Sequence, residues 1–273
     1  MAFISSTARD AGPTIAGFFL QVNVSILRWL DLTPSQRIEL ECGEDIDTVE
    51  SDENGPEKRL LEQLKLRSGR SVTLRSVEAL EALANYCSHI QQNPDVQLLF
   101  RYLTTAAIGV ETDWIGAESA IATWQAVREG EYGEQQRAEA IERLRLFLTG
   151  LPRPHKIAEA AWTLLQAAVA EEGSFLRLVT GFEWALDQPG LDRTETEIRS
   201  ILVQRGCASD ETQAGFLYEH LVAYVFRRLS RKGRAPLTAA DLTNACAQTV
   251  RTTKDDELIA LIRGVHRGDK CTA

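Results

Sequence analysis

An acidic residue and a glutamine–lysine pair lie at a spacing that suits metal chemistry. Asp45 is followed eighteen residues later by Gln63, Leu64 and Lys65. A carboxylate, an amide oxygen and the backbone carbonyl of Leu64 could hold Mg²⁺, and a lysine could position or help to deprotonate an attacking water. The metal and the ammonium group would both stabilise the negative charge that develops at phosphorus. These residues predict chemistry at phosphodiester bonds.

Two short strands are expected to bring these groups together. Residues 60–66 predict a short buried strand, whose period of two places Gln63 and Lys65 on the same side. The earlier segment 37–49 predicts further strand with a polar loop, and the turn-forming stretch 50–57 connects the two. Pairing of these strands would bring the earlier carboxylate beside the glutamine and the lysine.

The pattern resembles a known nuclease superfamily. Asp45 with Gln63-x-Lys65 is similar to the PD-(D/E)xK nucleases in the variant whose second acid is a glutamine. More narrowly, the run Gly17-Phe-Phe-Leu-Gln followed by Glu41-x-x-Glu-Asp resembles the double-stranded DNA endonuclease domains of bacterial antiphage systems. Those systems include the effectors of cyclic-oligonucleotide signalling (CBASS) and nuclease domains fused or partnered to large NTPases. The resemblance covers roughly the first 115 residues well and the remainder more loosely.

The resemblance implies a role for each matching residue of the trio. Asp45 would be the metal carboxylate, Gln63 a metal-side oxygen and Lys65 the catalytic lysine. The implied cofactor is Mg²⁺, with Mn²⁺ as an alternative ion. An amide binds Mg²⁺ more weakly than a carboxylate does, so the glutamine leaves the number of metals open.

Further residues match the family around this trio. Gln21 would face the site from the first helix. Glu41 and Glu44 match the acidic run, and Leu64 would add its backbone carbonyl to the metal shell. Which of these acids contacts the metal, or whether Asp47 does, is left open. Taken alone, an acidic turn of this kind is ordinarily a solvated loop.

The resemblance also implies the architecture. Residues 1–115 would form an α/β (α+β) restriction-endonuclease-like core with a mixed sheet flanked by helices. Apolar periodicity agrees, because it predicts a first core helix over 15–30, a second helix over 76–91 and a strand over 96–105. Residues 116–273 would form a mainly α-helical region that positions DNA, oligomerises or couples to a sensor.

Within this second region, local signals predict where elements begin and end. Residues 174–184 are expected to be a strand or a linker between helical blocks. Thr194-x-x-Glu and Thr238-x-x-Asp read as capping boxes that start helices. The helices themselves are expected over four ranges: 118–129, 134–148, 154–171 and 194–205.

The overall charge limits how nucleic acid could be bound. The formal net charge of −9 argues against a generic nucleic-acid coat, so positive charge must be concentrated locally or supplied by a partner. Arg67, Arg70 and Arg75 surround a flexible loop after the predicted catalytic strand and are candidate DNA contacts. The alternative is a solvated face balanced by nearby glutamates. A second basic cluster, 227–234, is explained mostly by a helix C-terminus.

Cysteine and apolar patterning exclude other classes. The five cysteines are scattered and odd in number, which favours neither a disulfide framework nor a zinc site. Cys42 flanks the acidic run, but burial is its expected role. The apolar stretch 15–30 is interrupted by polar residues and too short to span a bilayer, so a cytoplasmic protein without a membrane partner is expected.

These observations lead to a functional prediction and an alternative. The chain is predicted to be a Mg²⁺-dependent endodeoxyribonuclease that hydrolyses double-stranded DNA as a regulated antiphage effector. The alternative is a catalytically silent, nuclease-like subunit that binds nucleic acid or acts as a scaffold in a defence complex. A homo-oligomer is expected, with an NTPase or sensor partner on another chain or on a missing C-terminal extension.

Overall fold

The computed structural model describes residues 11–51, 55–67, 69–230 and 235–248. These residues form two compact units. Unit 1 comprises Met1–Gln21 and Glu39–Gly190, and unit 2 comprises Val22–Ile38 and Leu191–Ala273. The units therefore differ from a division at residue 115, because a late strand and the helices before it belong to the first unit.

A mixed sheet is the main feature of the fold, in the strand order β7-β5-β3-β2-β1-β8. Strands β2 and β3 are antiparallel, whereas β3, β5 and β7 run parallel to one another. The predicted mixed sheet with flanking helices is confirmed, but the restriction-endonuclease-like fold is not. The strands are β1 (Gln36–Leu40), β2 (Ile46–Glu50), β3 (Lys58–Lys65), β5 (Gln97–Thr104), β7 (Phe182–Ala185) and β8 (Leu237–Thr238).

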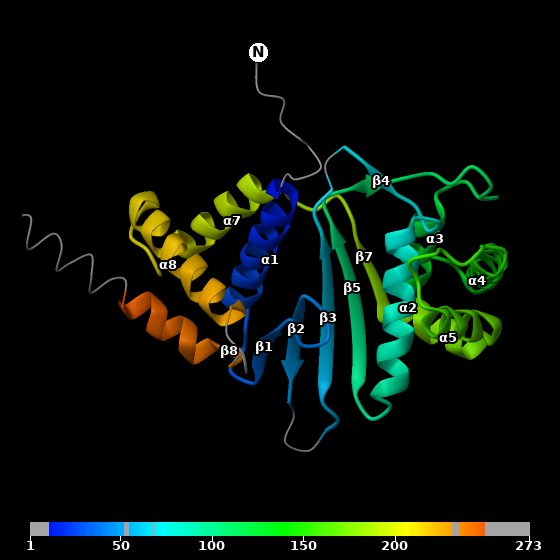
Figure 1. The fold of residues 1–273 in the computed structure, drawn as a ribbon, viewed down its shortest axis with the longest axis horizontal. Coiled ribbons are helices and arrows are strands. Elements are labelled where there is room, and N and C mark those ends of the chain that lie inside the picture. Colours follow the sequence, from blue (N-terminus) through cyan, green and yellow to red (C-terminus); the bar gives the residue numbers. More distant parts are fainter. Residues whose placement is uncertain (1–10, 52–54, 68, 231–234, 249–273) are drawn as a thin grey trace, which may run out of the picture. The chain divides into compact units, whose positions relative to one another are not determined.

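Helix α2 (Val77–Gln92) covers one face of this sheet in unit 1 (Figure 1). Its Tyr86 ring lies 5.6 Å from Phe100 of β5, and Phe100 stacks at 5.1 Å on Phe182 of β7. All three rings are almost completely buried. Strands β3 and β5 are consequently apolar along this face, which is why the sequence shows them as compact apolar runs.

A two-stranded sheet pairs β4 (Ser71–Val72) with β6 (Ala107–Ile108).

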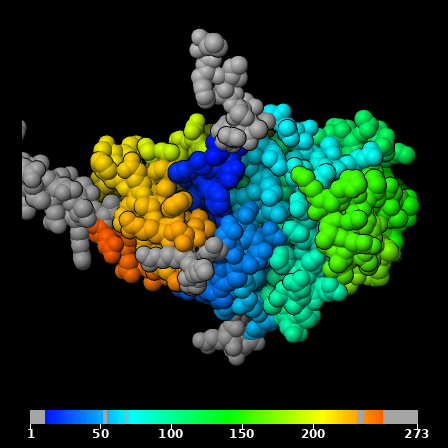
Figure 2. Space-filling model, viewed as in Figure 1, coloured from blue at the N-terminus to red at the C-terminus, as the bar shows by residue number. Residues whose placement is uncertain are grey.

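Four helices follow in unit 1, and α3 to α5 form much of the green surface in Figure 2. The Trp124 indole of α3 is buried and donates to the Phe182 carbonyl at 3.1 Å, which ties the helical layer to the edge strand β7. The helices are α3 (Ala120–Glu129), α4 (Glu134–Thr149), α5 (Glu159–Ala170) and α6 (Glu172–Gly181).

Helix α6 corrects the expectation of a strand or linker over 174–184. The Glu171 carboxylate accepts hydrogen bonds from the amides of Gly173 and Ser174, so it caps a helix. Apolar residues at helical spacing, Phe175, Leu178 and Val179, are buried against the core. Only the last three residues of the segment belong to strand β7 (Phe182–Ala185), so the expectation was right for those residues and wrong for the rest.

Unit 2 is mainly helical. Helix α1 (Gly12–Leu30), whose second part lies in this unit, confirms the predicted first helix, and α7 (Leu191–Gln204) and α8 (Glu211–Leu229) accompany it. The Trp29 indole donates to the Thr238 carbonyl at 2.7 Å. The Tyr218 hydroxyl donates to Oδ1 of Asn23 at 2.9 Å. Among the residues described, no helix is both long and apolar enough to cross a membrane.

One predicted capping box in unit 2 is confirmed and the other is wrong. Thr238 Oγ1 accepts from the Asp241 amide at 3.2 Å, and Asp241 Oδ2 accepts from the Thr238 amide at 3.1 Å. Residues 239–248 are helical, as this box requires. Thr194, in contrast, is buried inside α7, because that helix already begins at Leu191. Of the basic cluster, Arg228 contacts Asp241 at 3.5 Å, and residues 231–234 lie outside the described residues.

Candidate functional site

The acidic turn between β1 and β2 comprises residues 41–45 and lies in unit 1. The Glu41 amide donates to the Asp45 carbonyl at 3.2 Å, and the Glu41 backbone has a left-handed φ of 53°. A non-glycine residue in this region is strained, and such strain is tolerated where the surrounding contacts enforce it. The backbone of the turn is therefore held in place by contacts within the chain, although Glu41 and Cys42 are exposed to solvent.

A buried carboxylate, that of Asp47, holds the turn in place. Asp47 is fully buried and accepts from the Gly43 amide at 2.7 Å and the Glu44 amide at 3.0 Å. A Cβ on Gly43 would lie 2.9 Å from Oδ2 of Asp47, so the close approach requires glycine. Burial raises the pKa of Asp47, while the two amides and Arg59 oppose that rise. Asp47, which the sequence left open as a metal ligand, instead holds the turn.

Asp45 is held against the central strand. Its Oδ2 atom accepts a 2.6 Å hydrogen bond from the Leu64 amide of β3. Burial raises the pKa of Asp45 to about 6, with Glu41 and Glu44 adding to the rise, while the Leu64 amide and the Lys65 ammonium lower it. A partly buried carboxylate among other carboxylates favours a bound cation or proton.

Gln63 contributes a buried amide oxygen without a partner. The pairing of Ile46 with Glu62 makes Gln63 the next residue along β3, level with the end of the turn that carries Asp45. Gln63 is 7% exposed, and its Oε1 has no hydrogen-bond partner among the described residues. An unsatisfied buried acceptor costs about 1–3 kcal/mol. Lys65 follows at the end of the same strand, and is half-buried.

Two further predicted site residues, Gln21 and Glu41, lie beside this group. The Gln21 amide nitrogen donates to Oε1 of Glu41 at 2.7 Å and to the Asp45 carbonyl at 2.9 Å. These hydrogen bonds show that the first helix faces the turn, as expected, and the Gln21 side chain is only 5% exposed. Glu44 points elsewhere, because its Oε1 lies 3.2 Å from Nε2 of His89 in α2.

We refer to Gln21, Glu41, Asp45, Gln63 and Lys65 as the acidic-turn site. Hydrogen bonds join the first three, and strand register brings the last two beside them. Leu64, expected to offer its carbonyl to a metal, contributes its amide to Asp45. The oxygens gathered here are hard donors of the kind that Mg²⁺ prefers.

The predicted DNA contacts have a different character from the one expected. Arg67 forms an ion pair of 2.8 Å with Glu78, and Arg75 one of 2.5 Å with Asp113. Arg70 is exposed. Two of the three arginines therefore have carboxylate partners within the chain, and their role as DNA contacts stays a prediction.

An ionic cluster that the sequence did not reveal lies behind the turn. Glu39, Cys42 and Asp47 have ligand atoms within 4.8 Å of one another, as a metal site would. The cation among them is Arg59, whose Nη1 lies 3.0 Å from both carboxylates and 4.0 Å from the Cys42 sulfur. The pKa of Arg59 is raised, chiefly by a hydrogen bond to Glu57, against an opposing effect of burial. The guanidinium therefore takes the place of a metal here.

Cys42 belongs to this cluster but is exposed, so the expectation of burial was wrong. Partial burial and the carboxylates of Glu39 and Asp47 raise the pKa of its thiol. The sequence signal that could have identified the cluster is Arg59 itself, a cation near the start of a strand whose next two residues are leucines. Because Glu39 lies on β1 and Asp47 on β2, spacing alone could not pair them with Arg59 on β3.

Comparisons with known proteins identify similar structures but no family. No protein-family model matches the chain, and no curated protein matches it. The Acinetobacter baumannii Cap4 SAVED/CARF-domain containing receptor with the cyclic trinucleotide 3'3'3'-cAAA matches with a TM-score of 0.54 and 14% identity, over 93% of this chain and 47% of that one. The same receptor with 2'3'3'-cAAA gives a TM-score of 0.54, 14% identity and coverage of 93% and 48%.

A receptor from a second organism is also similar. The Moraxella osloensis Cap4 SAVED/CARF-domain containing receptor matches with a TM-score of 0.51 and 12% identity, over 89% of this chain and 48% of that one. This chain thus spans about half the length of the solved structures it resembles. At these identities the likeness shows a shared fold.

This likeness corrects the functional prediction. The matched structures are described as receptors, two of them with a cyclic trinucleotide, and not as DNA endonucleases. The prediction of a Mg²⁺-dependent endodeoxyribonuclease is therefore contradicted, and with it the assignment of the chain as a hydrolase of double-stranded DNA. The alternative, a binding subunit without catalysis, agrees better with these structures.

Proposed function

We propose that this chain is a binding module of an antiphage receptor, and that its acidic-turn site takes a phosphodiester-linked oligonucleotide through a divalent cation. The module would bind its ligand without cleaving it. Two separate lines support the proposal: the oxygen-rich geometry of the turn, and the likeness of the fold to receptors described with cyclic trinucleotides. The antiphage context is supported by the sequence resemblance described above.

The observation that carries the proposal is the unpartnered Oε1 of Gln63. It is buried beside Asp45, a carboxylate whose pKa is already raised to about 6. Protein interiors rarely leave such an acceptor unsatisfied, so each instance asks for an ion, a water or a ligand. A divalent cation would satisfy this oxygen and relieve the repulsion between Asp45 and Glu41 at the same time.

The donor set fits Mg²⁺, with Mn²⁺ as an alternative. Oδ2 of Asp45 accepts a hydrogen bond from the Leu64 amide, and Oδ1 would bind the cation. Glu41 would offer a second carboxylate, oriented by Gln21. Mg²⁺ keeps several waters and binds through one or two carboxylates plus substrate phosphates, so an incomplete protein shell is the usual arrangement. When bound, it would supply the positive charge that a phosphodiester requires.

Lys65 would provide the second contact to the ligand. It ends β3 directly after the cation-binding residues and its ammonium group acts on Asp45, whose pKa it lowers. A flexible ammonium is a common phosphate partner. Because the chain has a net charge of −9, both the cation and this lysine are needed to attract a polyanion.

The test is a binding titration of the purified chain with 3'3'3'-cAAA and, separately, with a short DNA duplex. Each titration is run with Mg²⁺, with Mn²⁺ and with EDTA, and the ligand is recovered and analysed for chain breaks. We expect cation-dependent binding with the ligand recovered intact. Asp45→Ala should abolish it, and Lys65→Ala should weaken it about tenfold, as the loss of one charge-assisted hydrogen bond implies.

A matched control separates site effects from general charge effects. Asp95→Ala removes an exposed carboxylate from the turn between α2 and β5 and should leave binding unchanged. Equal binding in EDTA, or binding that survives Asp45→Ala, would show that the acidic turn is not the site. Cation-dependent breakage of either ligand would contradict binding without cleavage. Preference between the two ligands identifies the class of oligonucleotide.

A further inference from the structure

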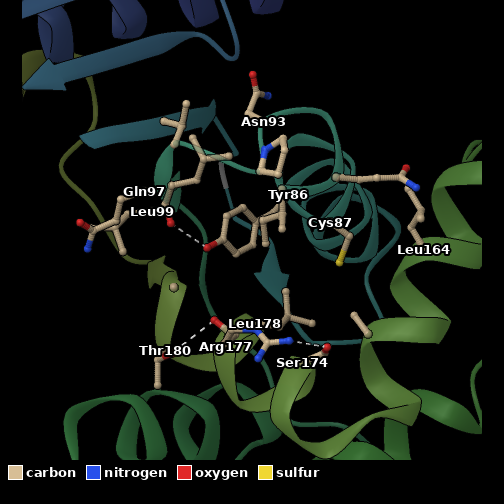
Figure 3. A pocket seen from close by; sticks show the side chains of 17 residues that line it. Tyr86, Cys87, Asn93, Gln97, Leu99, Leu164, Ser174, Arg177, Leu178 and Thr180 are labelled. Atoms are coloured by element: carbon tan, nitrogen blue, oxygen red, sulfur yellow. Dashed lines mark hydrogen bonds between the residues drawn. The ribbon is translucent and has the colours of Figure 1, made fainter. Parts of the chain in front are cut away.

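A recess of about 510 Å³ lies in unit 1 at the opposite end of the sheet from the acidic-turn site. It is bounded by the end of α2, the start of β5, and helices α5 and α6 (Figure 3). In the parallel pair, Lys58 lies opposite Gln97 and Lys65 lies opposite Thr104. The recess is lined by the starting residues of β5, whereas the acidic-turn site lies at the end of β3. Its volume is typical of small-molecule sites, which range over about 300–1,000 Å³.

The floor of this recess is preformed by Tyr86. Its hydroxyl donates to the Leu98 carbonyl at 2.9 Å (Figure 3). Its ring centroid lies 6.0 Å from that of Phe182. A Cβ on Gly181 would clash with the Tyr86 hydroxyl, so glycine there allows the ring to sit where it does. The tyrosine is 2% exposed and cannot swing outward to fill the space.

Two large apolar side chains at this recess are more exposed than core packing would leave them. Ile90 of α2 is 41% exposed and Leu99 of β5 is 43% exposed. Both line the recess together with Leu164, Ala168 and Leu178. Scattered exposed apolar residues need no explanation, but two that border one concave apolar site favour a ligand with an apolar body.

One cation stands among the lining residues. Arg177 of α6 is their only charged side chain, and its Nη2 donates to the Ser174 hydroxyl at 2.8 Å (Figure 3). Its nearest carboxylate, Glu171, is 3.8 Å away, and the side chains of both are mostly exposed, at 74% and 62%. Such a pair is weak, so the guanidinium can turn toward a bound anion.

We propose that this recess binds a small amphiphilic molecule with an apolar body and a single anionic group. The apolar body would cover Ile90 and Leu99, and the anionic group would pair with Arg177 and accept from Ser174. A medium-chain fatty acid has this chemistry, and a nucleoside monophosphate shares the anionic group but offers a flat aromatic base on a polar ribose in place of the aliphatic body. The site is independent of the acidic-turn site and of the function proposed for it.

The probe is 8-anilinonaphthalene-1-sulfonate, whose flat apolar rings and single sulfonate match the recess, and whose fluorescence reports binding. We expect saturable binding at one molecule per chain. AMP and decanoate are then added as competitors. Displacement by AMP identifies a nucleotide, displacement by decanoate identifies an aliphatic acid, and displacement by neither contradicts the proposal.

Two variants locate the bound probe. Arg177→Gln removes the cation and should weaken binding about fivefold, as the loss of one partly exposed charged contact implies. Ala168→Phe extends a ring into the recess from a half-buried position of α5 and should abolish binding. Arg193→Gln, at an exposed position of α7, is the matched charge control and should bind as the parent does.

The outcomes separate cleanly. Unchanged binding in Arg177→Gln or in Ala168→Phe overturns the proposal, as does binding that never saturates. If Ala168→Phe loses its thermal transition, Leu99→Gln replaces it, because that position is exposed on β5 and tolerates a polar side chain. The same loss of affinity is then expected, and unchanged affinity again overturns the proposal.

Discussion

The backbone amide of Leu64 donates a 2.6 Å hydrogen bond to Oδ2 of Asp45, so a strand inside the sheet holds the carboxylate of the acidic turn. Burial of Asp45 raises the free energy of its charged form, and the hydrogen bond from the Leu64 amide and the charge of Lys65 offset only part of that rise. The arrangement costs stability at neutral pH. A bound cation would recover it.

Asp45→Asn should change how stability depends on pH. The folded pKa of about 6 lies above the ordinary value of 3.8, so the protonated form contributes stability that is present below pH 3.8 and lost as pH rises through 6. Without metal, the free energy of unfolding of the variant, relative to that of the parent, should rise by about 2 kcal/mol between pH 4.5 and pH 7.5. Urea unfolding at both pH values measures it, with Asp95→Asn as background. If the difference in free energy of unfolding between variant and parent does not change with pH, Asp45 does not have the raised pKa.

Gln63→Leu should stabilise the metal-free protein by about 1 kcal/mol, because it removes a buried amide oxygen that has no partner. The same change should abolish any rise in melting temperature that Mg²⁺ causes, since a bound ion stabilises only the state that holds it. Gln97→Leu, at an exposed position of β5, is the control and should keep the Mg²⁺ effect. A destabilised Gln63→Leu protein would mean that the amide already has a partner.

Arg59→Met should destabilise the fold by about 3–5 kcal/mol, because it leaves the fully buried Asp47 without its cation. Asp47 also holds the Gly43 and Glu44 amides, so the acidic turn should loosen, as amide hydrogen exchange would detect. Arg75→Met breaks an exposed pair with Asp113 and should cost under about 1 kcal/mol. Equal losses in the two variants would show that the Arg59 cluster stabilises the fold no more than an exposed ion pair does.

Gly181→Ala should cost about 2 kcal/mol, since the new methyl group would clash with the Tyr86 hydroxyl. Adding Tyr86→Phe removes that oxygen and should restore part of the loss, which a double-mutant cycle measures. Gly17→Ala is the matched control, because nothing lies within 4 Å of its added Cβ in α1, and it should stabilise by roughly 0.5–1 kcal/mol. No recovery in the double variant would place the clash elsewhere.

Much of the local structure was predictable. The helices α1 and α2, the strands β3 and β5, and the capping box at Thr238 all follow from apolar periodicity and from side chains that bond to neighbouring amides. The segment over 174–184 was not, because its aromatic residues suit either a strand or a buried helix. The Glu171 cap and the packing of Phe175 decided for helix α6.

The proximity of Asp45, Gln63 and Lys65 was predicted as well, because an antiparallel pair with a polar connection brings the ends of its strands together. The chemistry assigned to them was wrong in its outcome, since the similar solved structures are receptors. Residue type and spacing specify which atoms can gather, but several functions use the same carboxylate, amide and ammonium groups.

The sequence by itself determined the elements of this protein and the set of residues at its acidic turn, because periodicity, caps and turn formers act over a few residues. Only the tertiary structure decided which carboxylates face the site. Asp47 contacts Arg59, Glu44 contacts His89 of α2, and the buried Oε1 of Gln63 has no hydrogen-bond partner within the part of the chain that the structure describes. These outcomes depend on contacts between segments far apart in the chain and on the free-energy cost of burying polar groups there. No local sequence pattern encodes that cost.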